Sequence, residues 1–103
     1  MEKKKILIIG GGVAGLSAGI FGRLNDFQTL ILEKNRTPGG QCTGWERKGY
    51  YIDGCIHWLT GTLEGTPMNE LWNRLGALDG AEIYHPESFL VFEHPDGTVV
   101  YHR

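Results

Sequence analysis

The pattern of apolar positions predicts a strand, a helix and a second strand at the start of the chain. A continuous apolar run occupies Lys5–Ile9 and stops at Gly10. Such a run is typical of a central strand of a parallel sheet, buried on both faces. Apolar residues at helical spacing follow over Val13–Leu24, and residues 28–33 form a second apolar run. Strand, helix and strand within about 30 residues close in a right-handed crossover, so we expect parallel strands.

Glycines interrupt the expected helix. Its apolar stripe consists of Val13, Leu16, Ile20 and Leu24, with Phe21 beside it. Gly15 and Gly19 are four residues apart and therefore share one face. Because each glycine costs about 1 kcal/mol of helix propensity relative to alanine, we expect these glycines to allow close packing on the sheet.

A second helix is predicted in the later part of the chain. Residues 34–49 are expected to form a loop. Thr66 suits the N-cap of the helix, Pro67 its first position, and Gly76 follows its last turn. The apolar stripe of this helix, which we expect to pack in a core, is Met68, Leu71, Trp72 and Leu75.

The remaining strands complete an α/β prediction. Tyr50–Asp53 is expected to be a short strand, and residues 88–93 and 98–102 a β-hairpin closed by the Pro95-Asp96-Gly97 turn. The expected fold is a Rossmann-like βαβ unit with a partial parallel sheet and a C-terminal β-hairpin. We divide the chain into a dinucleotide-binding part, residues 1–65, and a helix with hairpin, residues 66–103.

Composition excludes several function classes. The chain has 103 residues, enough for one small domain with its own core, and 41% are hydrophobic, 21% charged and the net charge is -2. This balance predicts no nucleic-acid partner. Without an apolar stretch of about 20 residues or an export signal, we expect no transmembrane segment and a cytoplasmic location. Cys42, Cys55 and His57 lack the paired spacing of a zinc site, so no metal is expected.

Glycine placement carries the main functional signal. Gly10, Gly12 and Gly15 form a Gly-x-Gly-x-x-Gly pattern that follows a strand and opens a helix. Gly10 permits the tight turn, Gly12 has no Cβ to obstruct a pyrophosphate, and Gly15 lets the helix approach the strand. The backbone N–H groups at the helix start, including those of Val13 and Ala14, favour phosphate. The pattern predicts dinucleotide binding.

An acidic residue completes this pattern. Glu33 ends the second strand, where a carboxylate accepts hydrogen bonds from ribose hydroxyls and repels a 2′-phosphate, so NADP is disfavoured. A P-loop has the same glycine spacing but requires lysine after the last glycine, and Leu16 stands there instead. The sequence therefore does not predict a nucleoside triphosphatase.

Two further segments carry a family resemblance. The Gly39-Gly40 pair six residues after Glu33 resembles the flavin-containing amine oxidase and phytoene dehydrogenase superfamily. The segment Gly49–Trp58 is similar to the branch that contains phytoene desaturase, carotenoid isomerase and retinol saturase. This resemblance implies that the dinucleotide is FAD, with Gly39 and Gly40 near its phosphate and ribityl groups.

The resemblance also sets the list of expected contacts. The cofactor-binding residues predicted in this way are Gly10, Gly12, Val13, Ala14, Gly15, Glu33, Lys34, Gly39, Gly40, Gln41 and Cys42. Asn35 and Gln41 stand where many members of the family carry arginine. Lys34 or Arg36 would therefore neutralise only part of the negative charge of the pyrophosphate. No catalytic residue is assigned, and His57 fits a structural role as well as one beside the flavin.

Three functions are compatible with these features. Because full-length relatives are several times longer, the resemblance implies an N-terminal fragment that is not active alone. Its parent would be an oxidoreductase that moves hydride between flavin and a small apolar, carotenoid-, isoprenoid- or retinoid-like substrate. The alternatives are a non-catalytic prenyl-binding module resembling Rab GDP-dissociation inhibitors, and an NAD-dependent enzyme domain. An exposed sheet edge is expected to favour self-association.

Overall fold

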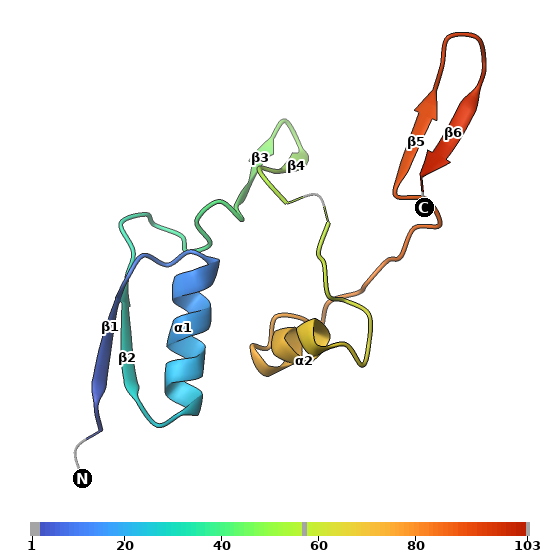
Figure 1. The fold of residues 1–103 in the computed structure, drawn as a ribbon. Coiled ribbons are helices and arrows are strands. Elements are labelled where there is room, and N and C mark those ends of the chain that lie inside the picture. Colours follow the sequence, from blue (N-terminus) through green and yellow to red (C-terminus); the bar gives the residue numbers. More distant parts are fainter. Residues whose placement is uncertain (1–2, 57, 103) are drawn as a thin grey trace.

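The first elements form a βαβ unit. The computed structural model describes residues 3–56 and 58–102. In it, β1 (Lys5–Ile9) and β2 (Gln28–Leu32) are joined by α1 (Val13–Leu24), which lies along the two strands (Figure 1). The strands are parallel, with Lys5 opposite Gln28 and Ile9 opposite Leu32. The predicted bounds of α1 and the parallel pairing are confirmed.

Glycines bring α1 against one face of this sheet. A Cβ built on Gly19 would lie 2.7 Å from Cδ1 of Ile31, and one on Gly22 would lie 2.6 Å from Cγ2 of Thr29. A Cβ on Gly15 would overlap the carbonyl oxygen of Gly10. Real Cβ atoms do not approach other atoms so closely, so the helix can pack at this distance only because these residues are glycines. The predicted close packing is confirmed.

The apolar stripe of α1 lies away from the sheet. On an ideal helix at about 100° per residue, Val13 and Ile20 fall opposite Gly15 and Gly22. Val13 is 43% exposed, and Ile20 and Leu24 are also exposed. The helix therefore has one face of glycine that contacts the sheet and one apolar face that the described residues leave open to solvent.

The prediction that β1 is buried on both faces is wrong. Leu7 and Ile9 are 59% and 77% exposed, whereas the alternate residues Ile6 and Ile8, on the side of α1, are half-buried. Leu30 and Leu32 of β2 are exposed in the same register. The reason is that α1 covers one face only, and no other element of the described chain covers the second face.

The predicted loop contains a strand that the sequence did not reveal. β3 (Gly44–Arg47) pairs with β4 (Tyr50–Asp53) in an antiparallel hairpin, so the expected loop over residues 34–49 is corrected to residues 34–43. Lys48 and Gly49 join the strands with φ of 52° and 80°. Two successive positive φ angles are typical of a type I′ hairpin turn, whose twist matches that of the strands.

The second helix begins and ends as predicted. α2 (Pro67–Arg74) is preceded by Thr66, whose Oγ1 accepts a hydrogen bond from the amide of Asn69 at 3.3 Å, and Gly76 follows with φ of 70°. The expected core packing of its apolar stripe is wrong, because Met68 is 46% exposed and Leu71 is exposed too. The one buried polar side chain among the described residues is Asn69, 5% exposed.

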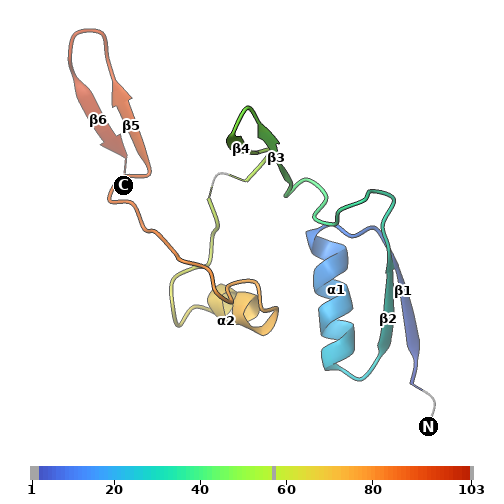
Figure 2. The same ribbon diagram turned by 180° about the vertical axis from the view of Figure 1, so that it is seen from behind.

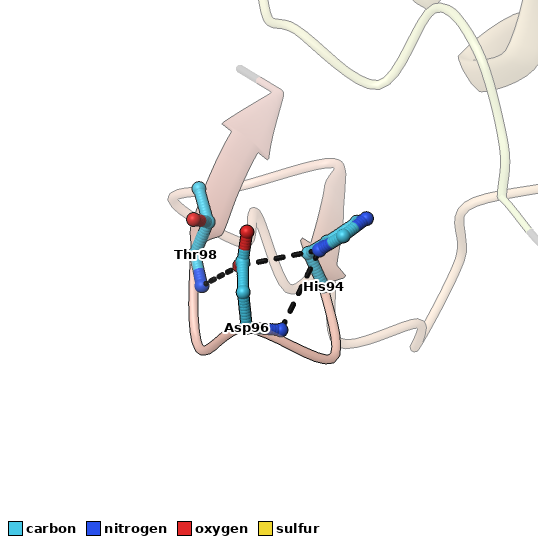
Figure 3. A network of polar contacts seen from close by, with 3 residues as sticks. All are labelled: His94, Asp96 and Thr98. Carbon is cyan, nitrogen blue, oxygen red and sulfur yellow. Dashed lines mark hydrogen bonds and ion pairs between the residues drawn. The ribbon is translucent and has the colours of Figure 1, made fainter.

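The C-terminal hairpin is confirmed. β5 (Leu90–Glu93) and β6 (Val99–His102) are antiparallel and joined by the predicted turn. In the turn, Asp96 Oδ1 accepts a hydrogen bond from the Thr98 amide at 2.8 Å, and His94 Nδ1 lies 3.2 Å from the same oxygen (Figure 3). Hydrogen bonds from Thr98, and then the contact with His94, lower the pKa of Asp96.

The elements do not gather around a shared core. The hairpins lie apart from the βαβ unit along the chain (Figure 2), and α2 reaches α1 through Arg74, whose guanidinium carbon lies 5.0 Å from the centre of the Phe21 ring. The radius of gyration is 18.7 Å, whereas a compact domain of this length has about 13 Å. No hydrophobic side chain among the described residues is buried, so the expectation of a core of its own is wrong. None of the helices in residues 3–56 and 58–102 has the length and apolar character that crossing a bilayer requires.

Candidate nucleotide-binding site

The glycine turn continues directly from β1. Gly10 has φ of 102°, and its amide donates to the carbonyl of Leu32 at 2.7 Å, which extends the pairing of β1 with β2 by one residue. A Cβ on Gly10 would meet nothing within 4 Å. Glycine is therefore required here for its backbone conformation and not for space. This agrees with the predicted role of Gly10 in the tight turn.

The start of α1 has no side-chain cap. Gly12 is the N-cap residue, with φ of -73° and ψ of 179°, no side-chain hydrogen bond caps the helix within the described chain, and its first turn contains no acidic residue. The amides of the first turn, those of Val13, Ala14 and Gly15, have no acceptor inside a helix. Together with the helix dipole they form a place for an anion.

Gly12 is not required by the protein itself. Its φ is ordinary for any residue, and a Cβ on it would meet only the Cα of Gly40 at 3.9 Å, a normal van der Waals distance. The contacts of the described residues would therefore tolerate alanine. The lack of a side chain matters only if something outside the chain approaches this backbone closely, which is what the glycine pattern predicts for a pyrophosphate.

The Gly-Gly loop lies against the glycine turn. The amide of Gly39 donates to the carbonyl of Gly11 at 2.8 Å, and Gly12 and Gly39 form a parallel bridge. A Cβ on Gly40 would lie 3.1 Å from the Cα of Gly12, and Gly39 and Gly40 have φ of 123° and 62°. Space and conformation therefore both favour glycine in this loop. Two motifs that are far apart in the sequence meet at one place.

Glu33 points into the same place. Its Oε1 accepts from the amide of Asn35 at 2.8 Å, and its Oε2 accepts from the amide of Gly11 at 2.7 Å. These two hydrogen bonds, first that from Asn35 and then that from Gly11, lower the pKa of Glu33, and the charge of Lys34 acts in the same direction. The half-buried carboxylate is therefore ionised at neutral pH and fixed in orientation.

Gly11 is the residue that sequence reasoning missed. It is buried, its amide is bound by Glu33, and its carbonyl is bound by Gly39. A Cβ on Gly11 would lie 3.2 Å from both Cβ and Oε2 of Glu33. The available signal was that Gly11 completes three consecutive glycines with Gly10 and Gly12, although the Gly-x-Gly-x-x-Gly pattern leaves its position unspecified.

The other predicted cofactor-binding residues make fewer contacts with the glycine turn. Lys34, Gln41 and Cys42 are exposed, and Cys42 contributes only its amide, which donates to the carbonyl of Gly39 at 3.0 Å. His57 lies outside the described residues. Within residues 3–56 and 58–102, no group of three or more His, Cys, Asp or Glu side chains lies close enough to hold a metal.

A separate hollow collects aromatic side chains. It has a volume of about 540 Å³ and lies between residues 58–62 and 82–89. The rings of Trp58 and Phe89 meet edge to face, with centroids 5.0 Å apart. The lining also includes Leu59, Ile83 and Tyr84. An open hollow of this size and character suits an apolar molecule.

The comparison with protein families agrees with this geometry. Residues 8–75 match the NAD(P)-binding Rossmann-like domain family. The chain belongs to this family. The match begins inside β1 and includes the glycine turn, Glu33, the Gly-Gly loop and α2.

The chain is also similar to curated proteins that are named as a reductase, an oxygenase and a desaturase. It is 29% identical to human all-trans-retinol 13,14-reductase over 97% of the chain and 17% of the relative. It is 40% identical to 4,4′-diaponeurosporene oxygenase of Staphylococcus haemolyticus, over 52% of the chain and 11% of the relative. It is also 40% identical to 1-hydroxycarotenoid 3,4-desaturase of a Flavobacterium species, over 48% of the chain and 10% of the relative.

These relatives confirm the resemblance to the phytoene dehydrogenase and retinol saturase branch. The chain spans about one sixth or less of the length of each of the three relatives.

Proposed function

We propose that the glycine turn, Glu33 and the Gly39-Gly40 loop bind FAD. The observation that carries this proposal is the meeting of the Gly-Gly loop with the bare start of α1, through the hydrogen bond from Gly39 to Gly11. A dinucleotide site of the simple NAD type has no need of such a loop. The loop lies beside Gly12, where a diphosphate would sit, and would extend the site toward the flavin half of the cofactor.

Each group of residues has its own part in holding FAD. The N–H groups from Gly12 to Gly15 would bind the diphosphate, with exposed Lys34 and Arg36 adding positive charge near it. The ionised carboxylate of Glu33 would accept from the adenosine ribose hydroxyls. When bound, FAD supplies hydride transfer, and the protein supplies position and electrostatics.

The activity proposed for the parent protein is that of an FAD-dependent oxidoreductase with an apolar substrate. Three relatives are named for retinol or carotenoids. The exposed apolar face of α1 and the aromatic hollow beside Trp58 leave apolar surface that further protein or substrate would cover. In this proposal residues 1–65 hold the cofactor, residues 66–103 lead into a substrate-facing region, the chain is part of a longer cytoplasmic protein, and it is inactive alone.

Flavin binding to the purified chain tests the proposal. Titration of FAD with the chain should quench flavin fluorescence, and NAD should compete weakly. The change Gly12→Asp should abolish quenching because a carboxylate would stand where the diphosphate binds. Thr66→Ala, at the start of the other helix, is the matched control and should leave quenching unchanged.

Two outcomes would favour the alternatives. Tight NAD binding with no response to FAD would support an NAD-dependent enzyme domain. Binding of a prenylated peptide without any response to either dinucleotide would support the non-catalytic module.

A further inference from the structure

Both backbone groups of Gly11 are occupied within the protein. Its amide donates to Oε2 of Glu33 at 2.7 Å, and its carbonyl accepts from the amide of Gly39 at 2.8 Å. Gly11 is buried, although its neighbours in the turn are not. The Gly11 amide therefore points toward the acid, and the diphosphate must be bound by the amides that come after it.

Glu33 retains capacity for a ligand while it holds the turn. An ionised carboxylate has about four acceptor positions. Two are used by the amides of Gly11 and Asn35. The acceptor capacity that is left can serve the ribose hydroxyls. The same side chain can thus act on the backbone and on the ligand together.

We infer that Glu33 is a positioning residue for the diphosphate turn in addition to its contact with the ribose. By fixing Gly11 from one side, with Gly39 fixing it from the other, Glu33 sets the direction of the next peptide and hence of the Gly12 amide. This inference rests on the proposed function. It makes affinity for the diphosphate depend on Glu33 even when no ribose hydroxyl is present.

A pair of ligands separates the two roles of Glu33. ADP carries both ribose hydroxyls, and 2′,3′-dideoxy-ADP has the same diphosphate without them. The change Glu33→Gln keeps the size of the side chain but places an NH2 group against one of the two amides. It should weaken binding of ADP about tenfold or more, and should also weaken binding of 2′,3′-dideoxy-ADP about tenfold.

The possible results lead to different conclusions. If the variant and the unmodified chain bind 2′,3′-dideoxy-ADP equally, Glu33 acts only through the ribose, and the inference is overturned while the proposed function stands. The same holds if the unmodified chain binds ADP but not the dideoxy compound. If the unmodified chain binds neither ADP nor FAD, the proposed function itself is overturned.

A measurement on the unmodified chain without ligand tests the inference even if the Glu33→Gln variant fails to fold. In the unmodified chain, hydrogen exchange of the Gly11 amide should be at least about tenfold slower than that of the Gly12 amide, because of these two amides only that of Gly11 has an acceptor among the described residues. Equal exchange rates for the two amides would overturn the inference whatever the variant does.

Discussion

The two helices of this chain begin in opposite ways. α2 starts with Thr66, whose hydroxyl accepts from the amide of Asn69, and Asn69 is buried. α1 starts with Gly12, which has no side chain to offer its first turn. Both N-cap residues have extended backbone, with ψ of 150° at Thr66 and 179° at Gly12, so either position could hold a capping side chain.

The difference supports the proposed ligand site at the start of α1. α2 satisfies its first turn internally, and this helps it to form without a large packed face. α1 leaves its first turn open and obtains stability from contact of its glycine face with β1 and β2. An uncapped helix start that the protein could readily cap is a sign that a ligand takes the place of the cap.

The largest effect is expected at the third position of α1. The change Gly15→Ala would force a Cβ into the carbonyl oxygen of Gly10, which is backbone and cannot move aside. We expect a loss of about 3 kcal/mol in the stability of the βαβ unit, measured by hydrogen exchange of the α1 amides. Gly12→Ala is the matched control and should change that stability by less than about 0.5 kcal/mol. Equal effects of the two changes would show that α1 does not pack as described.

A capping side chain at the start of α1 should stabilise this helix and weaken FAD binding. Gly12→Asp gives α1 the kind of cap that α2 has, so the helix should gain about 0.5 kcal/mol. FAD affinity should fall on the order of a hundredfold, because the new carboxylate repels the diphosphate. Flavin fluorescence and hydrogen exchange measure the two effects on one sample. A stabilised helix that still binds FAD normally would contradict the placement of the diphosphate.

Removing the cap of α2 should affect only α2. Thr66→Ala deletes the acceptor of the Asn69 amide and should destabilise this helix by about 1 kcal/mol. Faster hydrogen exchange of the Asn69 amide would report the change. Thr66→Ser, which retains the hydroxyl, should behave almost as the unmodified chain does. Altered FAD binding in Thr66→Ala would mean that the two helix starts are coupled.

The smallest effect concerns pH. The pKa of Glu33 is lowered by the amides of Asn35 and Gly11, so the native state binds this proton less tightly than the unfolded chain. The contribution of Glu33 is therefore complete above the ordinary Glu pKa and is lost as the pH falls through the lowered value. The Gly11 and Asn35 amide resonances should shift together in that range. The Asn69 amide, bound to a hydroxyl that does not titrate, should stay constant, and Glu33→Gln should remove the shift.

Local features were the most predictable from sequence. The bounds of α1, the Thr66 cap and the Pro95-Asp96-Gly97 turn each depend on a few neighbouring residues whose preferences are strong. The hairpin of β3 and β4 was missed because Lys48 is an uncommon residue in a turn of this type, which favours Asn, Asp or Gly. The family resemblance pointed to the Gly39-Gly40 loop but not to its contact with the glycine turn. The central position of Gly11 depends on a contact 22 residues away in sequence.

Burial was the least predictable property. The apolar run of β1 and the apolar stripe of α2 were both interpreted as core, yet Ile9 and Met68 are exposed. Apolar periodicity indicates which face seeks a partner, but it does not show that the partner is present. In α1 the face that contacts the sheet consists of glycines and not of apolar side chains. A small residue on a helix allows the closest approach of a sheet.

The bond from Gly39 to Gly11 has a consequence for the order of folding. The hydrogen bonds that shape the glycine turn join residues 22 to 28 positions apart, and all of them lie between Gly10 and Cys42. The entropic cost of closing a loop grows only slowly with its length, so these contacts do not depend on the later part of the chain. The turn can be complete while the residues beyond Cys42 are still unfolded. A nucleotide captured by the nascent chain would then stabilise this first piece by mass action and serve as a nucleus for the remaining elements, so that cofactor supply would set the yield of folded protein.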